Sequence, residues 1–169
     1  SWGYHTNGET QSLYFTDYRA GVELHEQRNW NENGTLTYSS STTNGGKGRL
    51  EKYFDEAGRP IREYTYRTGK RHGPYRLWHS GTDQLREEGS YLDGVYDGPW
   101  ESWHLNGEPE SEGDYENGIR IGDWVSYNDA GLQTNAETWI EGELCYLEQW
   151  TYQADGSWEP VEGETAPLV

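Results

Sequence analysis

The sequence is short of the side chains that most protein cores and many cofactor sites are built from. It has no Met, two Phe and one Cys, and hydrophobic residues make up 31% of its 169 residues. Cys145 alone forms neither an intrachain disulfide nor a thiolate metal cluster. No apolar run is long enough to cross a membrane as a helix. A disulfide framework within the chain, a cysteine metal centre and a membrane-spanning helix are therefore excluded.

Basic side chains are scarce and unevenly placed. The chain has 13 Lys and Arg against 30 Asp and Glu, for a net charge of −17. Residues 87–169 hold twenty of the acids and one base, Arg120, for a net charge of −19, whereas residues 1–86 carry +2. Nucleic acids and anionic membranes repel such a protein, because both are bound through clustered cations. The charge favours a basic partner for the second half, unless it serves solubility alone.

Aromatic residues and glycine are abundant instead. Aromatics make up 15% of the chain, with nine Trp and fourteen Tyr, and there are 22 Gly. A disordered chain of mean hydropathy −1.12 would not carry so many rings. Frequent glycine indicates tight turns, and flat amphipathic rings favour short strands. The composition is typical of an all-β protein.

The rings and glycines recur with a period of 24 or 25 residues. Gly73-Pro-Tyr-Arg-Leu-Trp-His-Ser-Gly81 is followed by Gly98-Pro-Trp-Glu-Ser-Trp-His-Leu-Asn-Gly107 and then by Gly122-Asp-Trp-Val-Ser-Tyr-Asn-Asp-Ala-Gly131. One column of rings consists of Trp30, Phe54, Trp78, Trp103, Tyr127 and Tyr152. A second column stands three residues before a Gly and consists of Tyr18, Thr42, Tyr66, Tyr91, Tyr115 and Trp139.

Each repeat has the pattern of a hairpin that passes into the next: strand, Asn-Gly or Ala-Gly turn, strand, and a second turn with Gly. The sequence predicts an all-β fold, an elongated, twisted antiparallel meander of tandem β-hairpin repeats in a single-layer open sheet. About six repeats form one array over 1–158, and 159–169 form a flexible acidic tail. The units lie near 1–23, 24–47, 48–72, 73–97, 98–121 and 122–145, with a partial unit at 146–158.

Both faces of such a sheet are expected to carry rings. Trp100 and Trp103 are three residues apart in one strand, so their side chains leave opposite faces. Gly89 and Gly113 fall inside second strands, where the missing side chain leaves room for a neighbouring ring across the backbone. We interpret the Trp column first as core and second as a binding surface, because a single layer cannot cover both of its faces.

Two segments, Gly98-Pro-Trp-Glu-Ser-Trp-His-Leu-Asn-Gly107 and Glu112-Gly-Asp-Tyr-Glu-Asn-Gly118, resemble the bacterial variant of the MORN repeat. The likeness is strongest over 73–145 and weaker over 1–72. Departures from the repeat pattern are Tyr64, Ala136 and Glu137. The resemblance implies a β-hairpin array. It also implies a role like that of antitoxins, or of the immunity proteins encoded beside secreted bacterial toxins.

Metal binding and catalysis are disfavoured by the repeat spacing. His79 and His104 share a repeat position, but such positions lie roughly 9.6 Å apart, too far to share a zinc ion bound at about 2.0–2.1 Å. One column of acids has the same spacing, near that of inverting glycosidases, but nothing supplies the asymmetric surroundings that would raise one pKa. A calcium site would lack the ordered loop of oxygen ligands. The acids concerned are Glu63, Glu88 and Glu112 for catalysis, and Asp93, Asp97, Asp114 and Glu116 for calcium.

The leading hypothesis is therefore a non-enzymatic protein-binding module without a cofactor. We expect a bacterial immunity or antitoxin protein that neutralises one toxin or effector with a basic surface, with complementary charge raising association rate and specificity. Neither nucleic acid nor membrane insertion is expected, and the oligomeric state stays open. The chain starts at Ser1, part-way through a repeat, which favours the bacterial envelope, periplasmic or lipid-anchored, over the cytoplasm. The expected partner-binding residues are Trp78, Glu88, Trp100, Trp103, Glu112, Asp114, Glu116, Trp124 and Tyr127.

Two alternatives belong to other functional classes. Aromatic hairpin repeats of about 20 residues also resemble choline-binding and glucan-binding modules, whose rings cage a ligand. The chain is alternatively a cell-wall or carbohydrate-binding repeat protein, although its longer period and its Glu-Gly-x-Tyr element fit those modules less well. The third hypothesis is a structural spacer, in which the ends of the array rather than its faces make contacts.

Overall fold

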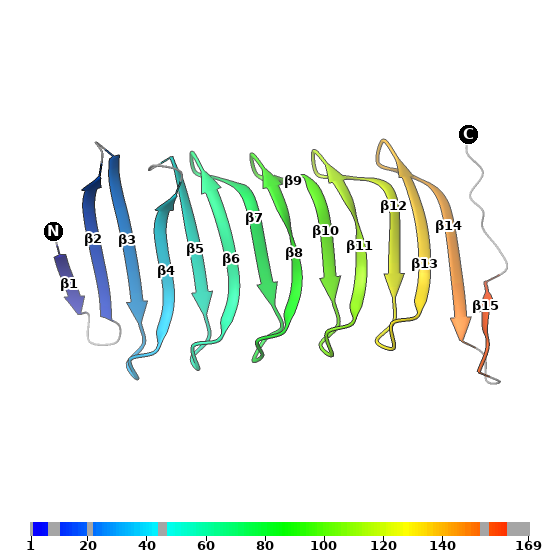
Figure 1. Cartoon of the computed structure of the whole chain (residues 1–169), viewed down its shortest axis with the longest axis horizontal. Coiled ribbons are helices and arrows are strands. Elements are labelled where there is room, and N and C mark those ends of the chain that lie inside the picture. The colour runs from blue at the N-terminus through cyan, green and yellow to red at the C-terminus, as the bar shows by residue number, and fades with distance from the viewer. Residues whose placement is uncertain (1, 7–10, 20–21, 44–46, 153–155, 162–169) are drawn as a thin grey trace. The chain divides into compact units, whose positions relative to one another are not determined.

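The computed structural model describes residues 2–6, 11–19, 22–43, 47–152 and 156–161, and in these residues all regular secondary structure is β-strand (Figure 1). Each strand is antiparallel to its hydrogen-bonded neighbours wherever the register is defined. The order in the sheet follows the chain from β1 to β8 and from β10 to β15, and the two-residue β9 pairs with β8. The predicted all-β fold, an open antiparallel meander in a single layer, is confirmed.

Contacts divide the chain into two compact units. Unit 1 comprises Ser1–Gln84 and Tyr91–Gly94, and unit 2 comprises Leu85–Ser90 and Val95–Val169. The strands of unit 1 are β1 (Trp2–Thr6), β2 (Gln11–Arg19), β3 (Val22–Trp30), β4 (Leu36–Thr43), β5 (Gly48–Phe54), β6 (Pro60–Arg67) and β7 (Lys70–Trp78). Both units draw residues from β8 (Leu85–Leu92). The strands of unit 2 are β9 (Val95–Tyr96), β10 (Gly98–Trp103), β11 (Pro109–Glu116), β12 (Ile119–Tyr127), β13 (Gln133–Ile140), β14 (Glu143–Tyr152) and β15 (Trp158–Pro160).

The last strand, β15, extends past the boundary expected at residue 158 and includes Glu159 and Pro160. Residues 162–169, the rest of the expected tail, lie outside the described residues. Over the part of the chain that is described, no helix has the length and hydropathy needed to span a membrane.

Two-residue turns connect the second strand of one repeat to the first strand of the next. Between β6 and β7, Thr68 and Gly69 have φ values of 49° and 82°. Positive φ at both central residues is the requirement of a type I′ turn, whose twist matches that of the strands it joins. The same pair of positive φ values recurs at Asp93–Gly94, Asn117–Gly118 and Glu141–Gly142. Turn geometry thus explains the glycine column at these four positions, and Gly21 and Gly45 of the same column lie outside the described residues.

The longer turn inside each repeat begins at one repeat position. At Asp55 the backbone N–H donates to the carbonyl of Arg59 at 2.8 Å, and the side chain accepts from the amides of Ala57 and Arg59, each at 2.9 Å. These hydrogen bonds, above all that from the Arg59 amide, hold the pKa of this carboxyl below its usual range. His79 and His104 occupy the same position in later repeats, and their N–H groups close the corresponding turns. Both histidines therefore belong to the turn framework.

The first ring column coincides with irregularities in strand pairing. The register shifts immediately before the column residue in four repeats, at Trp30, Phe54, Trp103 and Tyr127. Such a β-bulge places an extra residue in the partner strand and increases the local twist. The bulges therefore set the pairing register between the two strands that each of these long turns connects.

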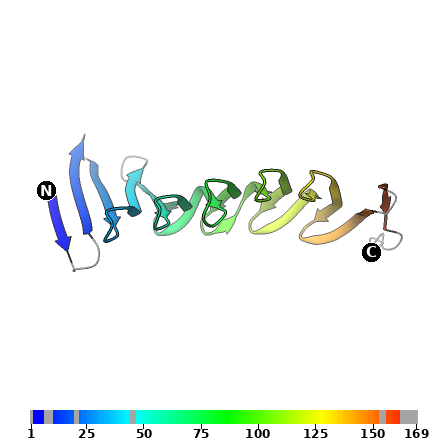
Figure 2. The ribbon, with the colours of Figure 1, turned by 90° about the horizontal axis from the view of Figure 1, so that it is seen from below.

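Each unit has a ring face, on which aromatic side chains pack against one another. Figure 2 looks along the strands, and it shows no second layer over the described residues of either unit. In unit 1 the most buried rings are Tyr64, Tyr75 and Tyr91, at 8%, 1% and 8% exposure. Tyr75 stacks on Tyr64 at 6.2 Å and lies 4.9 Å from Tyr91 between ring centroids. In unit 2 the corresponding residue is Trp124, at 2% exposure.

Candidate functional site

The ring face of unit 2 is centred on Trp124 in β12. Its ring lies 5.4 Å from Trp100 and 5.0 Å from Tyr115, measured between centroids. Trp100 donates its indole N–H to Glu87 at 2.9 Å. Gly113, the direct cross-strand partner of Trp100, lies under the Trp124 ring, and a Cβ at this position would be 2.2 Å from Trp124 Cδ2. The expectation that a ring lies across the backbone at Gly113 is confirmed.

The single base of the second half of the chain, Arg120, is used on this same face. Its guanidinium lies 4.1 Å from the Trp124 ring centroid and 5.5 Å from that of Trp139. It also pairs with Glu137 at 3.2 Å, and Glu137 accepts the indole N–H of Trp139 at 2.8 Å. Arg120 thus stabilises the ring face by cation–π and ionic contacts. Its positive charge is therefore not paired with the carboxylates of the opposite face.

The opposite face of unit 2 carries a row of carboxylates across three strands. Glu88 in β8 is the direct partner of Glu101 in β10, and Glu101 is the direct partner of Glu112 in β11. Direct partners share a face, with Cβ atoms about 4.5–5.5 Å apart. The repeat pattern in the sequence indicates Glu88 and Glu112 as site residues but not Glu101. Only the pairing register identifies Glu101, because no repeated motif marks it.

A second line of carboxylates runs along β11 and meets this row at Glu112. Asp114 and Glu116 follow Glu112 at alternate positions, so all three side chains leave the same face, and all three are exposed. We call Glu88, Glu101, Glu112, Asp114 and Glu116 the acidic face. Besides Arg120, the described residues of unit 2 include one other Lys or Arg, which is Arg86. It stands two residues before Glu88 in β8, so its side chain leaves the same face as the acids. Its guanidinium lies 4.0 Å from the Glu87 carboxylate.

Two rings of the first column lie on the acidic side of the sheet. Tyr127 donates its hydroxyl hydrogen to Glu112 at 2.8 Å. This hydrogen bond raises the pKa of the Tyr127 phenol above its ordinary value, with a smaller contribution from burial. Trp103 has the same parity in β10 as Glu101, and it is half-buried. Carboxylates and rings therefore lie together on this face.

The nine residues expected to bind a partner are thus divided. Six lie on the acidic side of unit 2, where the strands bring them together: Glu88, Trp103, Glu112, Asp114, Glu116 and Tyr127. Trp100 and Trp124 point to the ring face, and we assign them to the core because they pack against each other and Trp124 is buried. Trp78 belongs to unit 1, at the end of β7.

Unit 1 contains a buried carboxylate that sequence analysis did not single out. Glu51 is 6% exposed and accepts hydrogen bonds from the hydroxyls of Tyr38 at 3.2 Å and Tyr53 at 3.1 Å. It also pairs with Arg49 at 2.8 Å. These partners satisfy the buried charge, which is otherwise costly to desolvate. Strand alternation, which places Arg49, Glu51 and Tyr53 on one face, is the signal that would have identified the cluster.

The Tyr53 phenol makes the stability of unit 1 depend on pH at the alkaline end. Burial and the nearby Glu51 carboxylate raise its pKa to about 12, whereas an unfolded tyrosine ionises near pH 10. The folded state therefore holds the proton more tightly. Its contribution to stability is complete below about pH 10 and is lost as the pH rises from about 10 to 12. We expect urea unfolding of Tyr53→Phe to depend less on pH over this window than that of the native chain, and equal slopes would contradict the assignment.

The histidines and acids weighed as metal ligands are not brought together. No group of three or more His, Cys, Asp or Glu side chains suited to a metal ion occurs among the described residues. Asp93 belongs to unit 1, where its carboxylate lies 3.1 Å from His72 Nδ1. Asp97, in unit 2, accepts the backbone N–H of Asn117 at 3.2 Å. Asp93 and Asp97 thus take part in separate local contacts, while Asp114 and Glu116 lie exposed on the acidic face.

No known family model and no curated protein sequence matches the chain. Among solved structures, it is similar to S. aureus TarM in a crystal structure of a point mutant in complex with Fondaparinux, alpha-GlcNAc-glycerol and UDP, with 10% identity over 64% of this chain and 21% of that chain and a TM-score of 0.38. A second crystal structure of TarM gives 11% identity, 64% and 20% coverage, and a TM-score of 0.38. The chain spans about a fifth of TarM. A likeness at this TM-score defines neither fold nor function.

Proposed function

We propose that the chain is a non-enzymatic protein-binding module that binds one cationic protein through the acidic face of unit 2. The observation that supports this most directly is the row Glu88, Glu101 and Glu112, three carboxylates in direct cross-strand register. Like charges placed directly opposite each other destabilise a sheet. A partner that supplies Lys or Arg side chains would lower the repulsion within this row.

The surroundings of the row support a protein partner. Asp114 and Glu116 extend the negative surface along β11, while Trp103 and Tyr127 add aromatic area beside it. Exposed acids raise the association rate with a basic partner and discriminate against acidic ones, and rings provide the desolvated contacts that hold a complex together. Trp124 and Arg120 on the ring face hold the strands that present these side chains.

The acidic face lies within residues 73–145, the part of the chain that most resembles the bacterial variant of the MORN repeat. With that resemblance, we propose an immunity or antitoxin protein whose partner is a toxin or effector with a basic surface. Neutralisation would then follow from occupation of that basic surface. Cell-wall or carbohydrate binding is the competing function, and it is separated from protein binding by the experiment below.

The test replaces acids on the face and, for comparison, acids elsewhere in unit 2. The face variant carries Glu101→Lys, Asp114→Lys and Glu116→Lys, three exposed positions of which none bonds to Tyr127. The matched control carries Asp129→Lys, Glu141→Lys and Glu159→Lys, three exposed positions outside the acidic face with the same change in net charge. Both variants should keep the native β-sheet circular dichroism spectrum.

The native chain is first used as bait for a soluble bacterial lysate and for purified cell walls, at low and high salt. We expect one basic protein that is retained at low salt and released at high salt, because screening weakens exposed charge pairs. Affinity for that purified protein should fall about 100-fold in the face variant and only a few-fold in the control. Equal affinities for both variants, or retention by cell walls alone, would contradict the proposal.

A further inference from the structure

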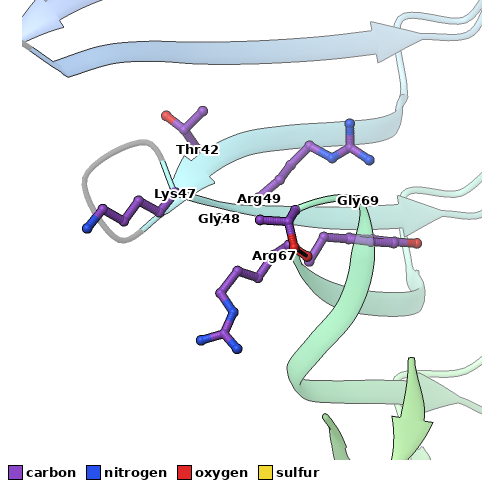
Figure 3. A pocket seen from close by; sticks show the side chains of 8 residues that line it. Thr42, Lys47, Gly48, Arg49, Arg67 and Gly69 are labelled. Carbon is purple, nitrogen blue, oxygen red and sulfur yellow. Dashed lines mark hydrogen bonds between the residues drawn. The ribbon is translucent and has the colours of Figure 1, made fainter. Parts of the chain in front are cut away.

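Unit 1 contains a cavity of about 580 Å³ at one end of β4, β5 and β6. Its floor includes Thr42, Arg49 and Tyr66, which are direct partners across these three strands. Strand ends and the β6–β7 turn supply the other lining residues, Lys47, Gly48, Arg67, Thr68 and Gly69. In Figure 3 the Lys47 and Arg67 side chains leave the strand ends and extend to the same side of the view. The volume lies within the range of small-molecule sites, roughly 300–1,000 Å³.

The lining of the cavity is cationic in a chain whose net charge is −17. Lys47, Arg49 and Arg67 contribute to it, and none of the lining residues that the structure describes is acidic. Lys47 makes no ion pair with the described carboxylates. Arg67 is 3.7 Å from Asp93, a long ion pair, and its side chain is 48% exposed. Arg49 alone has a close carboxylate, Glu51 at 2.8 Å.

We propose that this cavity binds a small organic molecule that carries a phosphate or sulfate ester. A carboxylate is satisfied by one planar guanidinium fork, whereas a phosphate or sulfate ester offers three terminal oxygens to donors from several directions. Lys47 immediately precedes β5 and Arg67 is the last residue of β6, so two cations from different strands border the cavity on one side (Figure 3). Arg49 and Tyr66 border the cavity from the other face of the strands, where the Arg49 guanidinium lies 5.1 Å from the Tyr66 ring centroid.

The site is independent of the acidic face, since all its residues belong to unit 1. Failure of protein binding by unit 2 would leave it untouched. It also differs from the aromatic cages weighed for choline, which attract cations. The ligand chemistry inferred for unit 1 is anionic.

The experiment measures binding of three small molecules by isothermal titration calorimetry: glucose 6-phosphate, glucose 6-sulfate and glucose. The site variant carries Lys47→Ala and Arg67→Ala. The matched control carries Arg76→Ala and Arg86→Ala, which removes the same charge from two side chains that are each 49% exposed and lie 3.9 Å and 4.0 Å from their carboxylate partners. Thermal unfolding of each variant checks that the fold is retained.

We expect the native chain and the control to bind at least one of the two esters and not to bind glucose. The site variant should bind that ester about tenfold or more weakly, because two charge-assisted contacts are lost. Tighter binding of the phosphate assigns a phosphorylated ligand, and tighter binding of the sulfate assigns a sulfated one. Any of three results would overturn the proposal. The first is that neither ester binds at about 10 mM, a concentration far above usual ligand dissociation constants. The others are that glucose binds as tightly as the esters, or that the site variant and the control lose equal affinity.

Discussion

Gly113→Ala is expected to destabilise unit 2 by about 2–3 kcal/mol, although it adds a single methyl group. The Cβ would lie 2.2 Å from Cδ2 and 2.3 Å from Cε2 of Trp124, closer than any real contact. The indole cannot move aside freely, because Trp100 and Tyr115 pack against it and Arg120 covers it. The clash is with the rigid ring itself, so the strands or the whole Trp124 side chain must shift. Thermal unfolding followed by tryptophan fluorescence should show a Tm lower by about 5–10 °C.

Asp114→Ala is the matched control for this prediction. It introduces alanine at the next position of β11, where the side chain is exposed on the opposite face. We expect its Tm to change little, because surface substitutions away from packed or hydrogen-bonded groups are usually within about 0.5 kcal/mol. If Gly113→Ala were as stable as Asp114→Ala, the Trp124 ring would not lie over Gly113 in solution.

Tyr75→Ala is expected to have the larger effect, a loss of about 3–5 kcal/mol from unit 1. Tyr75 is 1% exposed, and its ring is held between Tyr64 and Tyr91 at centroid distances of 6.2 Å and 4.9 Å. Arg71 lies 4.0 Å from the Tyr64 ring and 5.3 Å from the Tyr91 ring. In a single-layer sheet the neighbouring strands have no second layer to collapse onto the cavity, so its surroundings relax only partly. Urea unfolding followed by circular dichroism measures the loss.

The control for Tyr75 is Tyr14→Ala in β2, which removes the same side chain from a position that is 44% exposed. Its hydroxyl accepts a hydrogen bond from Gln27 at 3.3 Å in exposed surroundings. We expect a loss of about 1 kcal/mol or less at this exposed position. Similar losses for both variants would show that the Tyr64, Tyr75 and Tyr91 cluster is not the core of unit 1.

Much of the fold was predictable because its information is local. Two-residue turns need glycine where φ is positive, so the spacing of turns, and with it the hairpin repeat, is written in the chain at positions such as Gly69. Gly113 was also recognisable, since a glycine inside a strand indicates close approach by another group. The charge asymmetry between the two halves follows from composition alone.

The candidate site was only partly predictable, because its geometry depends on pairing between strands. Glu101 gains its meaning from being opposite Glu88 and Glu112, residues 13 and 11 positions away along the chain. Trp100 and Trp103 could be placed on opposite faces by alternation, but which of them shares a face with the acids follows from the register. β-bulges such as that at Trp103 shift this register by one residue, and a one-residue shift exchanges the two faces.

The sequence by itself determined the repeat period, the all-β class, the turn positions and the acidic second half, since each depends on residues a few positions apart or on composition. The tertiary structure alone decided that Arg120 pairs with Glu137 on the ring face rather than with a carboxylate of the acidic face. It alone placed Lys47, Arg49 and Arg67 around one cavity, with Glu51 buried beside Arg49. These arrangements depend on cross-strand register, which side-chain packing and bulges set together and which no single strand contains.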